Sequence, residues 1–230
     1  MSTRLLLALL LFVALALPTY AMDSLNMPTG NAMKPGTSEL NFIYVTQPLK
    51  VNKAGQVKVD DMRYVKLFTG VTDRLQVDVD FLDIAHADSY GILNAFYTVV
   101  KETPEHPSLI VGGTNLTGSD WLGGTDFGGN PDYDDPSFFA LGAYNLAKPA
   151  RPSWKTPLVR LHLGWGNNFH DEELFGMLQL KFDPRFTAVI QNYKSMPTYI
   201  GTYQVTDDLQ VSMGTMDSNF FWRVGGVLKW

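Results

Sequence analysis

Residues 220–230 read FFWRVGGVLKW. Successive side chains of a β-strand point to opposite faces of its sheet. As a strand, this stretch would place large apolar residues at even positions, from Phe220 to Trp230, and the cations Arg223 and Lys229 at odd positions. The even face suits lipid, whereas the odd face keeps its charges away from lipid. A half-buried strand of a soluble protein would alternate in the same way. The rest of the chain must therefore decide between a membrane strand and a soluble one.

The same stretch resembles the closing strand of bacterial outer-membrane β-barrels. Those strands typically end on an aromatic residue that the barrel-assembly machinery reads. The resemblance implies that Trp230 is an assembly signal and that the barrel-assembly machinery is a partner. It also implies contact with outer-membrane lipid and lipopolysaccharide along the apolar face.

The N-terminus has the features of an export signal. Arg4 supplies a short positive region, Leu5–Leu17 is an apolar run, and Pro18–Ala21 ends on residues suited to cleavage. The run is too short for a transmembrane helix, and no second long apolar run follows it. We therefore expect a signal peptide over residues 1–21, cleavage near Ala21, and a mature chain in the bacterial outer membrane.

The composition excludes several classes of protein. The formal charge is −5, which argues against nucleic acid as a partner because nucleic-acid-binding surfaces are basic. The chain has no cysteine, so disulfides, cysteine-based metal sites and a lipid anchor at the cleavage site are excluded. Aromatic residues make up 13% and charged residues 18% of the chain, and its mean hydropathy is −0.05. That balance is expected where apolar and polar residues alternate.

Alternating stretches bounded by turn residues follow one another from residue 39 onward, as expected for strands. Most are near the roughly nine to eleven residues that cross a bilayer as a tilted strand. The pattern predicts an all-β, antiparallel up-and-down transmembrane β-barrel of about twelve strands over residues 39–230, after an irregular periplasmic segment at 22–38. The predicted strands are 39–46, 57–70, 74–84, 90–102, 107–117, 137–147, 157–166, 174–182, 185–194, 197–205, 208–215 and 219–230.

The connections between these strands provide a check that is independent of their number. In outer-membrane barrels both termini are periplasmic, periplasmic turns are short, and outer loops are longer. The even-numbered connections should then be periplasmic, and four of those five are short. The odd-numbered connections include the longest, residues 118–136, although those at 195–196 and 217–218 are also short.

The alternation also assigns charged side chains to a lumen. Apolar residues at odd positions of 75–81 alternate with Asp78 and Asp80, and those of 159–165 alternate with Arg160 and His162. A lysine or arginine on the lipid face near the bilayer midplane costs roughly 2–4 kcal/mol, so such residues should point inward. The predicted lumen cluster has both signs of charge and can pair internally. It consists of Lys66, Asp78, Asp80, Arg160, His162, Lys181 and Arg223.

Two further parts of the sequence carry a family resemblance. The first is Met27–Gly30 followed by Lys34–Thr37 and a strand, and the second runs from Leu174–Gly176 through the turn at 183–189 to Asn192–Lys194. They resemble YjbH-type outer-membrane proteins, a family associated with exopolysaccharide production. The second stretch departs from the family because Asn192 and Lys194 stand where members tend to carry a Glu-Tyr-Asp-Gly-like turn. The resemblance implies a porin-like β-barrel and a link to polysaccharide.

The sequence gives only weak signals for a catalytic or metal site. No nucleophile elbow, phosphate loop or zinc-helix motif is present. His162 lies inside a clear strand and faces the predicted lumen near Arg160, but the sequence specifies no serine to complete a triad. We interpret it as a polar lumen residue and expect no catalytic group, no cofactor and no metal.

The longest connection, residues 118–136, contains glycine pairs and five aspartates, whose spacing matches no known calcium loop. We interpret it as a solvated outer loop in which Trp121 is a candidate sugar contact. The other tryptophans should form aromatic belts, with Trp165 and Trp222 at the outer end and Trp154 and Trp230 at the periplasmic end.

Three functions follow from these observations. The first is an outer-membrane β-barrel with a structural or transport role in exopolysaccharide export or envelope assembly. The second is a membrane-embedded enzyme that modifies lipid or lipopolysaccharide through His162. The third is a secreted, soluble β-sandwich that binds carbohydrate. The signal peptide, the terminal aromatic residue and the asymmetry of the connections favour the first.

Overall fold

The computed structural model describes residues 32–46, 50–51, 57–58, 62–84, 89–118, 136–167, 174–193, 196–216 and 219–230. The fold of these residues is all-β, and none of them forms a helix long and apolar enough to cross a membrane. The strands are β1 (Thr37–Val45), β2 (Lys50–Val51), β3 (Val57–Lys58), β4 (Met62–Gly70), β5 (Leu75–Ile84), β6 (Ser89–Val100), β7 (Ser108–Thr114), β8 (Ser137–Ala147), β9 (Leu158–Gly166), β10 (Leu174–Lys181), β11 (Phe186–Tyr193), β12 (Met196–Gln204), β13 (Leu209–Met216) and β14 (Asn219–Lys229).

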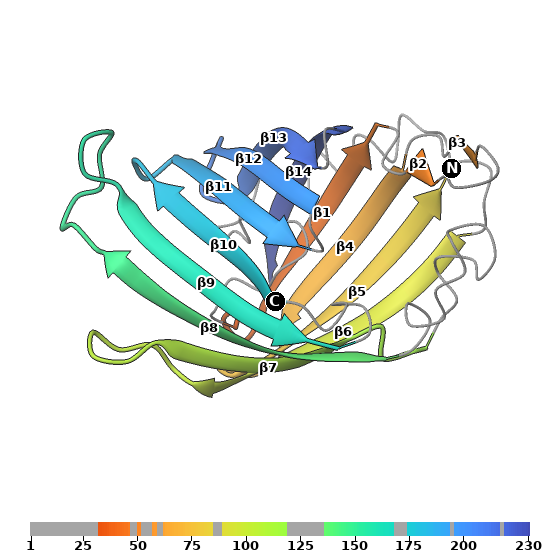
Figure 1. Ribbon diagram of the computed structural model, residues 1–230, viewed down its shortest axis with the longest axis horizontal. Helices are drawn as coiled ribbons and strands as arrows, with labels where there is room; N and C mark the ends of the chain where they lie inside the picture. Colours follow the sequence, from red (N-terminus) through yellow and green to blue (C-terminus); the bar gives the residue numbers. More distant parts are fainter. Residues whose placement is uncertain are drawn as a thin grey trace.

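Twelve of these strands form one closed antiparallel barrel, and β2 pairs only with β3 (Figure 1). Each barrel strand pairs with its neighbours in the chain, and β1 closes the ring by pairing with both β14 and β4. The predicted all-β, up-and-down architecture of about twelve strands is therefore confirmed.

The largest boundary difference falls in the predicted strand 57–70. There the barrel strand β4 begins only at Met62, and residues 57–58 form the separate strand β3. Asp60 and Asp61 are consecutive acidic residues, so the alternation that assigns side chains to two faces is interrupted between these strands.

The barrel has two different ends. The turn end holds the connections 71–74, 101–107, 148–157, 182–185 and 205–208, together with Gly36 and Trp230. The strand ends that flank the remaining connections lie at the other end, which we call the loop end, and the longest of these connections joins β7 to β8 in the sequence. This arrangement matches the predicted division into even-numbered and odd-numbered connections.

The five turn-end connections share one local device. In each, a side-chain oxygen accepts hydrogen bonds from backbone N–H groups two or three residues further along. Asp183 Oδ1, for example, accepts from the N–H of Arg185 at 2.6 Å and from that of Phe186 at 2.8 Å. Short side chains of this kind stabilise turns because they satisfy backbone donors locally. The other four are Thr72, Thr103, Ser153 and Thr206.

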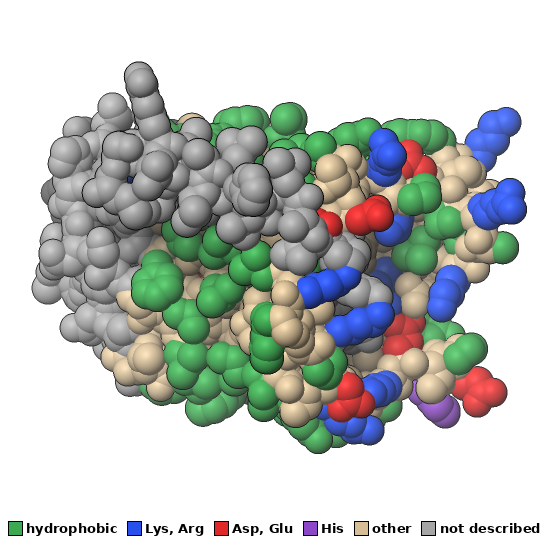
Figure 2. All heavy atoms as spheres, turned by 180° about the vertical axis from the view of Figure 1, so that it is seen from behind, with side chains coloured by type: hydrophobic (Ala, Val, Ile, Leu, Met, Phe, Trp, Pro, Cys, Tyr) green, Lys and Arg blue, Asp and Glu red, His purple; other side chains and the backbone are tan. Residues whose placement is uncertain are grey.

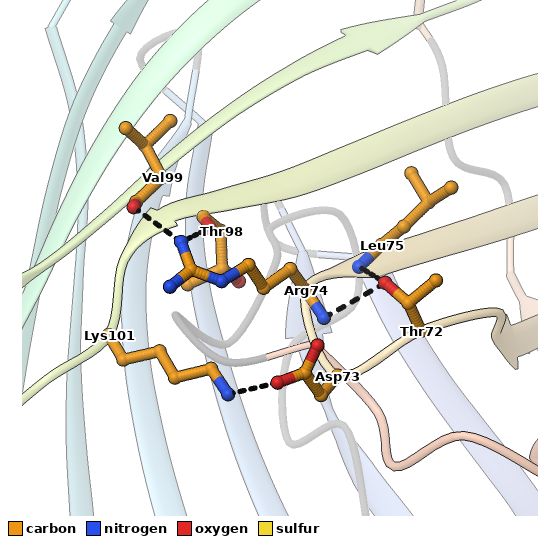
Figure 3. Close-up of polar contacts among 7 residues, drawn as sticks. All are labelled: Thr72, Asp73, Arg74, Leu75, Thr98, Val99 and Lys101. Atoms are coloured by element: carbon orange, nitrogen blue, oxygen red, sulfur yellow. Dashed lines mark hydrogen bonds and ion pairs between the residues drawn. The ribbon is translucent and has the colours of Figure 1, made fainter.

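A bulge in β6 is stabilised by the turn between β4 and β5 (Figure 3). The β6–β7 register shifts at Val99, and a bulge of this kind leaves the local ladder disrupted. The Arg74 guanidinium donates to the Val99 carbonyl oxygen at 2.9 Å and to that of Thr98 at 3.4 Å. Beyond the bulge, Lys101 forms an ion pair with Asp73. The hydrogen bond from Lys101 lowers the pKa of the exposed Asp73 carboxyl.

The junction of β1 and β14 closes the barrel. The two strands pair over nine residues, and beyond the last pair the Trp230 N–H donates to the Gly36 carbonyl oxygen at 3.0 Å. The Trp230 indole N–H also donates to Ser38 Oγ at 3.0 Å. Gly36 has a φ of 72°, and a Cβ there would lie 2.9 Å from the Trp230 carbonyl oxygen. Only glycine fits this position without strain.

The residues immediately before β1 fold into the turn end of the barrel. Met33 is buried against Phe68, and its N–H donates to Gln76 Oε1 at 3.2 Å. A Cβ on Gly70 would lie 2.3 Å from the Lys34 carbonyl oxygen, so glycine permits this close approach. The described part of the segment predicted to be irregular therefore packs against β4 and β5.

Candidate functional site in the barrel interior

Buried polar and charged side chains line much of the inside of the barrel wall, and exposed apolar side chains lie on its outside. Glu39 and Arg223 are only 0% and 2% exposed, and many other polar side chains are buried with them. Charged residues are almost never fully buried unless they are paired. Figure 2 shows apolar side chains over much of the visible wall and charged side chains gathered towards one end. Exposed large apolar residues on the outer face include Phe81, Tyr97, Val111, Leu163, Ile190, Tyr199 and Met213.

Aromatic residues lie on the outer wall at both ends. At the loop end, Trp165 is exposed, and Trp222 stacks on Tyr44 with ring centroids 5.8 Å apart. At the turn end, Trp154 and Trp230 are exposed. These are the four positions that the sequence assigned to the two aromatic belts.

One group of buried polar residues centres on Lys66 and Asp80, which face each other on β4 and β5. The ammonium and the carboxylate are 3.1 Å apart, and Asn94 donates to the same carboxylate at 3.2 Å. Two residues along β5, Asp78 accepts a hydrogen bond from Gln76 at 2.9 Å. Ionised and amide partners therefore bind Asp78 and one carboxylate oxygen of Asp80, whereas Oδ1 of Asp80 has no hydrogen-bond partner among the described residues.

A second group lies beside it, on β1 and β13. Glu39 accepts hydrogen bonds from Asn41 at 3.0 Å and from Gln210 at 2.8 Å. On the neighbouring strand β14, Arg223 donates to Ser212 Oγ from Nε at 3.1 Å and from Nη2 at 2.8 Å. The Arg223 side chain thus lies on the interior face that the sequence assigned to it.

A third group occupies the opposite side of the ring, on β8 and β9. Arg160 forms an ion pair with Glu102, and the two side chains are 8% and 11% exposed. The same carboxylate accepts hydrogen bonds from the backbone N–H of Asn145 at 3.0 Å and from its side-chain amide at 2.5 Å. Glu102 belongs to the β6–β7 connection and reaches this pair from the turn end.

His162 and Lys181 complete the predicted lumen cluster. His162 is fully buried, with Ala143 and Met177 as its cross-strand partners. The hydroxyl of Ser108, two strands away in the same row, donates to the Ala143 carbonyl oxygen at 3.1 Å. Lys181 ends β10 and is half-buried, on the same face of that strand as Met177.

Apolar groups fill another part of the interior. Phe96 and Phe139 have ring centroids 5.6 Å apart, and Phe139 and Phe175 have centroids 6.2 Å apart. These rings stand on alternate strands, and a Cβ on the intervening glycines, Gly112 and Gly164, would lie within 2.5 Å of a ring atom. Alternating large and small inward residues is how a small barrel fills its own lumen. We call these three rings the aromatic shelf.

The structure separates the predicted lumen cluster into distinct groups and adds members to them. Lys66 is paired with Asp80, whereas Arg160 on β9 is paired with Glu102. Glu39 was missed, although it alternates with apolar residues in its strand and could have been recognised. Glu102 is the last residue of the predicted strand 90–102, but β6 ends at Val100 after a register shift, so alternation does not set the direction of its side chain.

Two of the predicted features fall outside the described residues. They are Trp121, the candidate sugar contact, and the aspartates of its loop. The segment proposed as a signal peptide also lies outside the described ranges.

No family model matches the chain, and no curated protein shows significant similarity to it. The fold and its interior nevertheless define a class of protein. It is a closed twelve-stranded β-barrel with buried ion pairs inside and an apolar outer wall.

Proposed function

We propose that this chain is an outer-membrane β-barrel protein with a structural or transport role in the bacterial envelope. The observation that carries the proposal is the distribution of side chains, with ion pairs inside and exposed apolar residues outside. A bilayer requires an apolar outer surface, and it requires that every backbone polar group be satisfied within the protein. A closed barrel with this wall meets both requirements.

The proposed resting state is closed to large solutes. The aromatic shelf occupies part of the lumen. Lys66 is paired with Asp80 on the neighbouring strand, Glu39 accepts a hydrogen bond from Gln210 two strands away, and Arg160 is paired with Glu102 of a turn-end connection. Met33 is buried at the turn end. A structural role, or transport that requires rearrangement of these groups, fits this interior better than a wide passive pore.

The proposed setting is exopolysaccharide export or envelope assembly. Its support is the sequence resemblance to YjbH-type proteins, and Trp121 remains the candidate contact for a sugar ring. Assembly machinery that reads Trp230 is part of the same proposal. If deletion of the gene abolishes polysaccharide secretion and the wild-type gene restores it, the result would support this setting. Unchanged secretion in the deletion strain would contradict a role in polysaccharide export.

We propose no catalytic role for the interior. A hydrolase or acyltransferase site needs a nucleophile within hydrogen-bonding reach of its base. His162 instead has Ala143 and Met177 beside it, and the Ser108 hydroxyl is bonded to a backbone carbonyl. These contacts favour a packing role for the histidine.

Membrane fractionation of a Gram-negative host tests the proposed location. The protein should sediment with the outer membrane, resist extraction by alkaline carbonate, and migrate differently on gels before and after heating. The reason is that a closed barrel has no free sheet edge and unfolds slowly in detergent. Recovery of the folded chain in the soluble periplasmic fraction, with no heat-dependent shift, would contradict the proposal.

A further inference from the structure

The turn end carries an exposed cluster of aromatic and basic residues outside the lumen. Trp154, in the β8–β9 connection, is 66% exposed, yet its ring stacks on that of Phe182 in the adjacent β10–β11 connection and on that of Phe186, the first residue of β11. Its centroid lies 4.6 Å from that of Phe182 and 5.3 Å from that of Phe186, with interplanar angles of 21° and 27°. The stack therefore joins the two turns into one surface.

Both phenylalanines belong to the outer face of the barrel. Phe186 is two residues before Ala188 on the outward face of β11, whose inward residues Thr187 and Val189 are buried. Phe182 continues the outward positions of β10 past Leu180. The aromatic stack is thus continuous with the apolar outer wall and lies at its rim.

The two connections that contribute to this stack also carry four exposed cations: Lys148, Arg151 and Lys155 in one connection and Arg185 in the other. Asp183 is the only carboxylate in the two connections, and it accepts hydrogen bonds from two backbone N–H groups. The two connections therefore carry a net charge of +3. We call the aromatic stack and these four cations the basic rim patch.

The other three turn-end connections have the opposite balance. They hold two cations and five carboxylates, a net charge of −3, and Lys34 and Lys229 lie outside the connections at the same end. The whole chain is acidic, with a formal charge of −5. The basic rim patch is therefore a local concentration of positive charge over β8–β11, not a reflection of the overall composition.

We infer that the basic rim patch binds the headgroups of anionic phospholipids, such as phosphatidylglycerol, in the adjacent membrane leaflet. The inference rests on the proposed membrane location. Stacked aromatic rings at the rim lie at the depth of the headgroup region, and cations beside them face phosphate groups. An anionic lipid satisfies both parts of the patch at once, because its acyl chains contact the outer wall while its phosphate meets the guanidinium and ammonium groups.

The preference can be measured with the full-length protein refolded into phosphatidylcholine vesicles that contain a trace of spin-labelled lipid. Electron paramagnetic resonance separates lipids held at the protein surface from those in bulk. Spin-labelled phosphatidylglycerol should associate with the wild-type barrel about fivefold more strongly than spin-labelled phosphatidylcholine. This ratio corresponds to the attraction between one Lys or Arg side chain and an anionic membrane surface. Raising the salt concentration should weaken this preference, because exposed charges are screened.

Two triple variants isolate the patch. R151Q/K155Q/R185Q removes three cations from the basic rim patch, whereas K34Q/K101Q/K229Q removes three cations elsewhere at the turn end. Both variants have the same net charge, and retention of the heat-dependent gel shift confirms that each is folded. We expect the first variant to lose most of the preference and the second to keep it.

The outcomes separate the inference from the proposed function. Equal losses in the two variants, or no preference in the wild type, would overturn the lipid-binding patch while leaving the membrane barrel intact. Absence of any surface-held lipid around the wild-type protein, whichever lipid carries the label, would instead overturn the proposed membrane location.

Discussion

Replacing Leu163 with lysine should lower the free energy of unfolding from lipid vesicles by about 2–4 kcal/mol. Leu163 is 56% exposed on the outer face, close to the middle of β9. At that depth the variant would place an ammonium group in hydrocarbon, where no partner or water is available. Urea unfolding followed by tryptophan fluorescence, in vesicles of fixed composition, measures the effect.

The matched control is Leu174→Lys. Leu174 is 76% exposed at the loop end of the neighbouring strand β10, paired with Trp165 in the aromatic belt. The same substitution should cost only about 0–1 kcal/mol there, because the charge can reach water at the interface. Similar small effects at both positions would mean that the outer wall faces water, since exposed surface changes usually alter stability by about 0.5 kcal/mol or less.

Removal of the carboxylate that pairs with Arg160 should lower the free energy of unfolding about as much as Leu163→Lys does. Glu102→Gln leaves the buried guanidinium without its ionised partner, and breaking a buried pair from one side costs about 3–5 kcal/mol. The double change Glu102→Gln with Arg160→Met should recover much of this loss, because no unpaired charge remains buried. The same unfolding measurement applies.

Glu105→Gln provides a control in the same connection, because Glu105 is exposed. Its unfolding free energy should stay within about 0.5 kcal/mol of the wild-type value. If Glu102→Gln and Glu105→Gln have equal effects, or if the double variant is no more stable than Glu102→Gln alone, the ion pair does not stabilise the interior.

The strand pattern was predictable because alternation is a local property of the sequence. The predicted strand 137–147 coincides with β8 residue for residue, and the even and odd positions of 220–228 lie on the outer and inner faces as expected. Each face is fixed by the cost of placing a charge or a large apolar group on the wrong side. A closed barrel, in place of a soluble sandwich, was predicted from the expected signal peptide, the terminal aromatic residue and the asymmetry of the connections, and the twelve-stranded barrel confirms it.

The partners of the buried charges were less predictable, because pairing depends on register between strands. Lys66 and Asp80 could be matched once β4 and β5 were neighbours, and they lie directly opposite each other. Arg160 has a partner from a connection, and Glu102 follows a strand whose register shifts at a bulge. Alternation ends with the strand, so it gives no direction for a side chain such as that of Glu102.

The outward face of the barrel can be probed directly with single cysteines, because the chain has none of its own. Leu163, Ile190 and Met213 lie on three strands of the outer wall and are 56%, 46% and 61% exposed, whereas Gln191, the inward control, is 1% exposed. Each variant is labelled with a small bimane fluorophore and refolded into vesicles. Lipids brominated in the middle of the acyl chain should quench the fluorescence of the three outward labels strongly, and aqueous iodide should quench it weakly. The brominated lipids should not quench the label at position 191. Strong quenching of the outward labels by iodide, with none from the brominated lipid, would contradict the account of this chain as a membrane-embedded β-barrel.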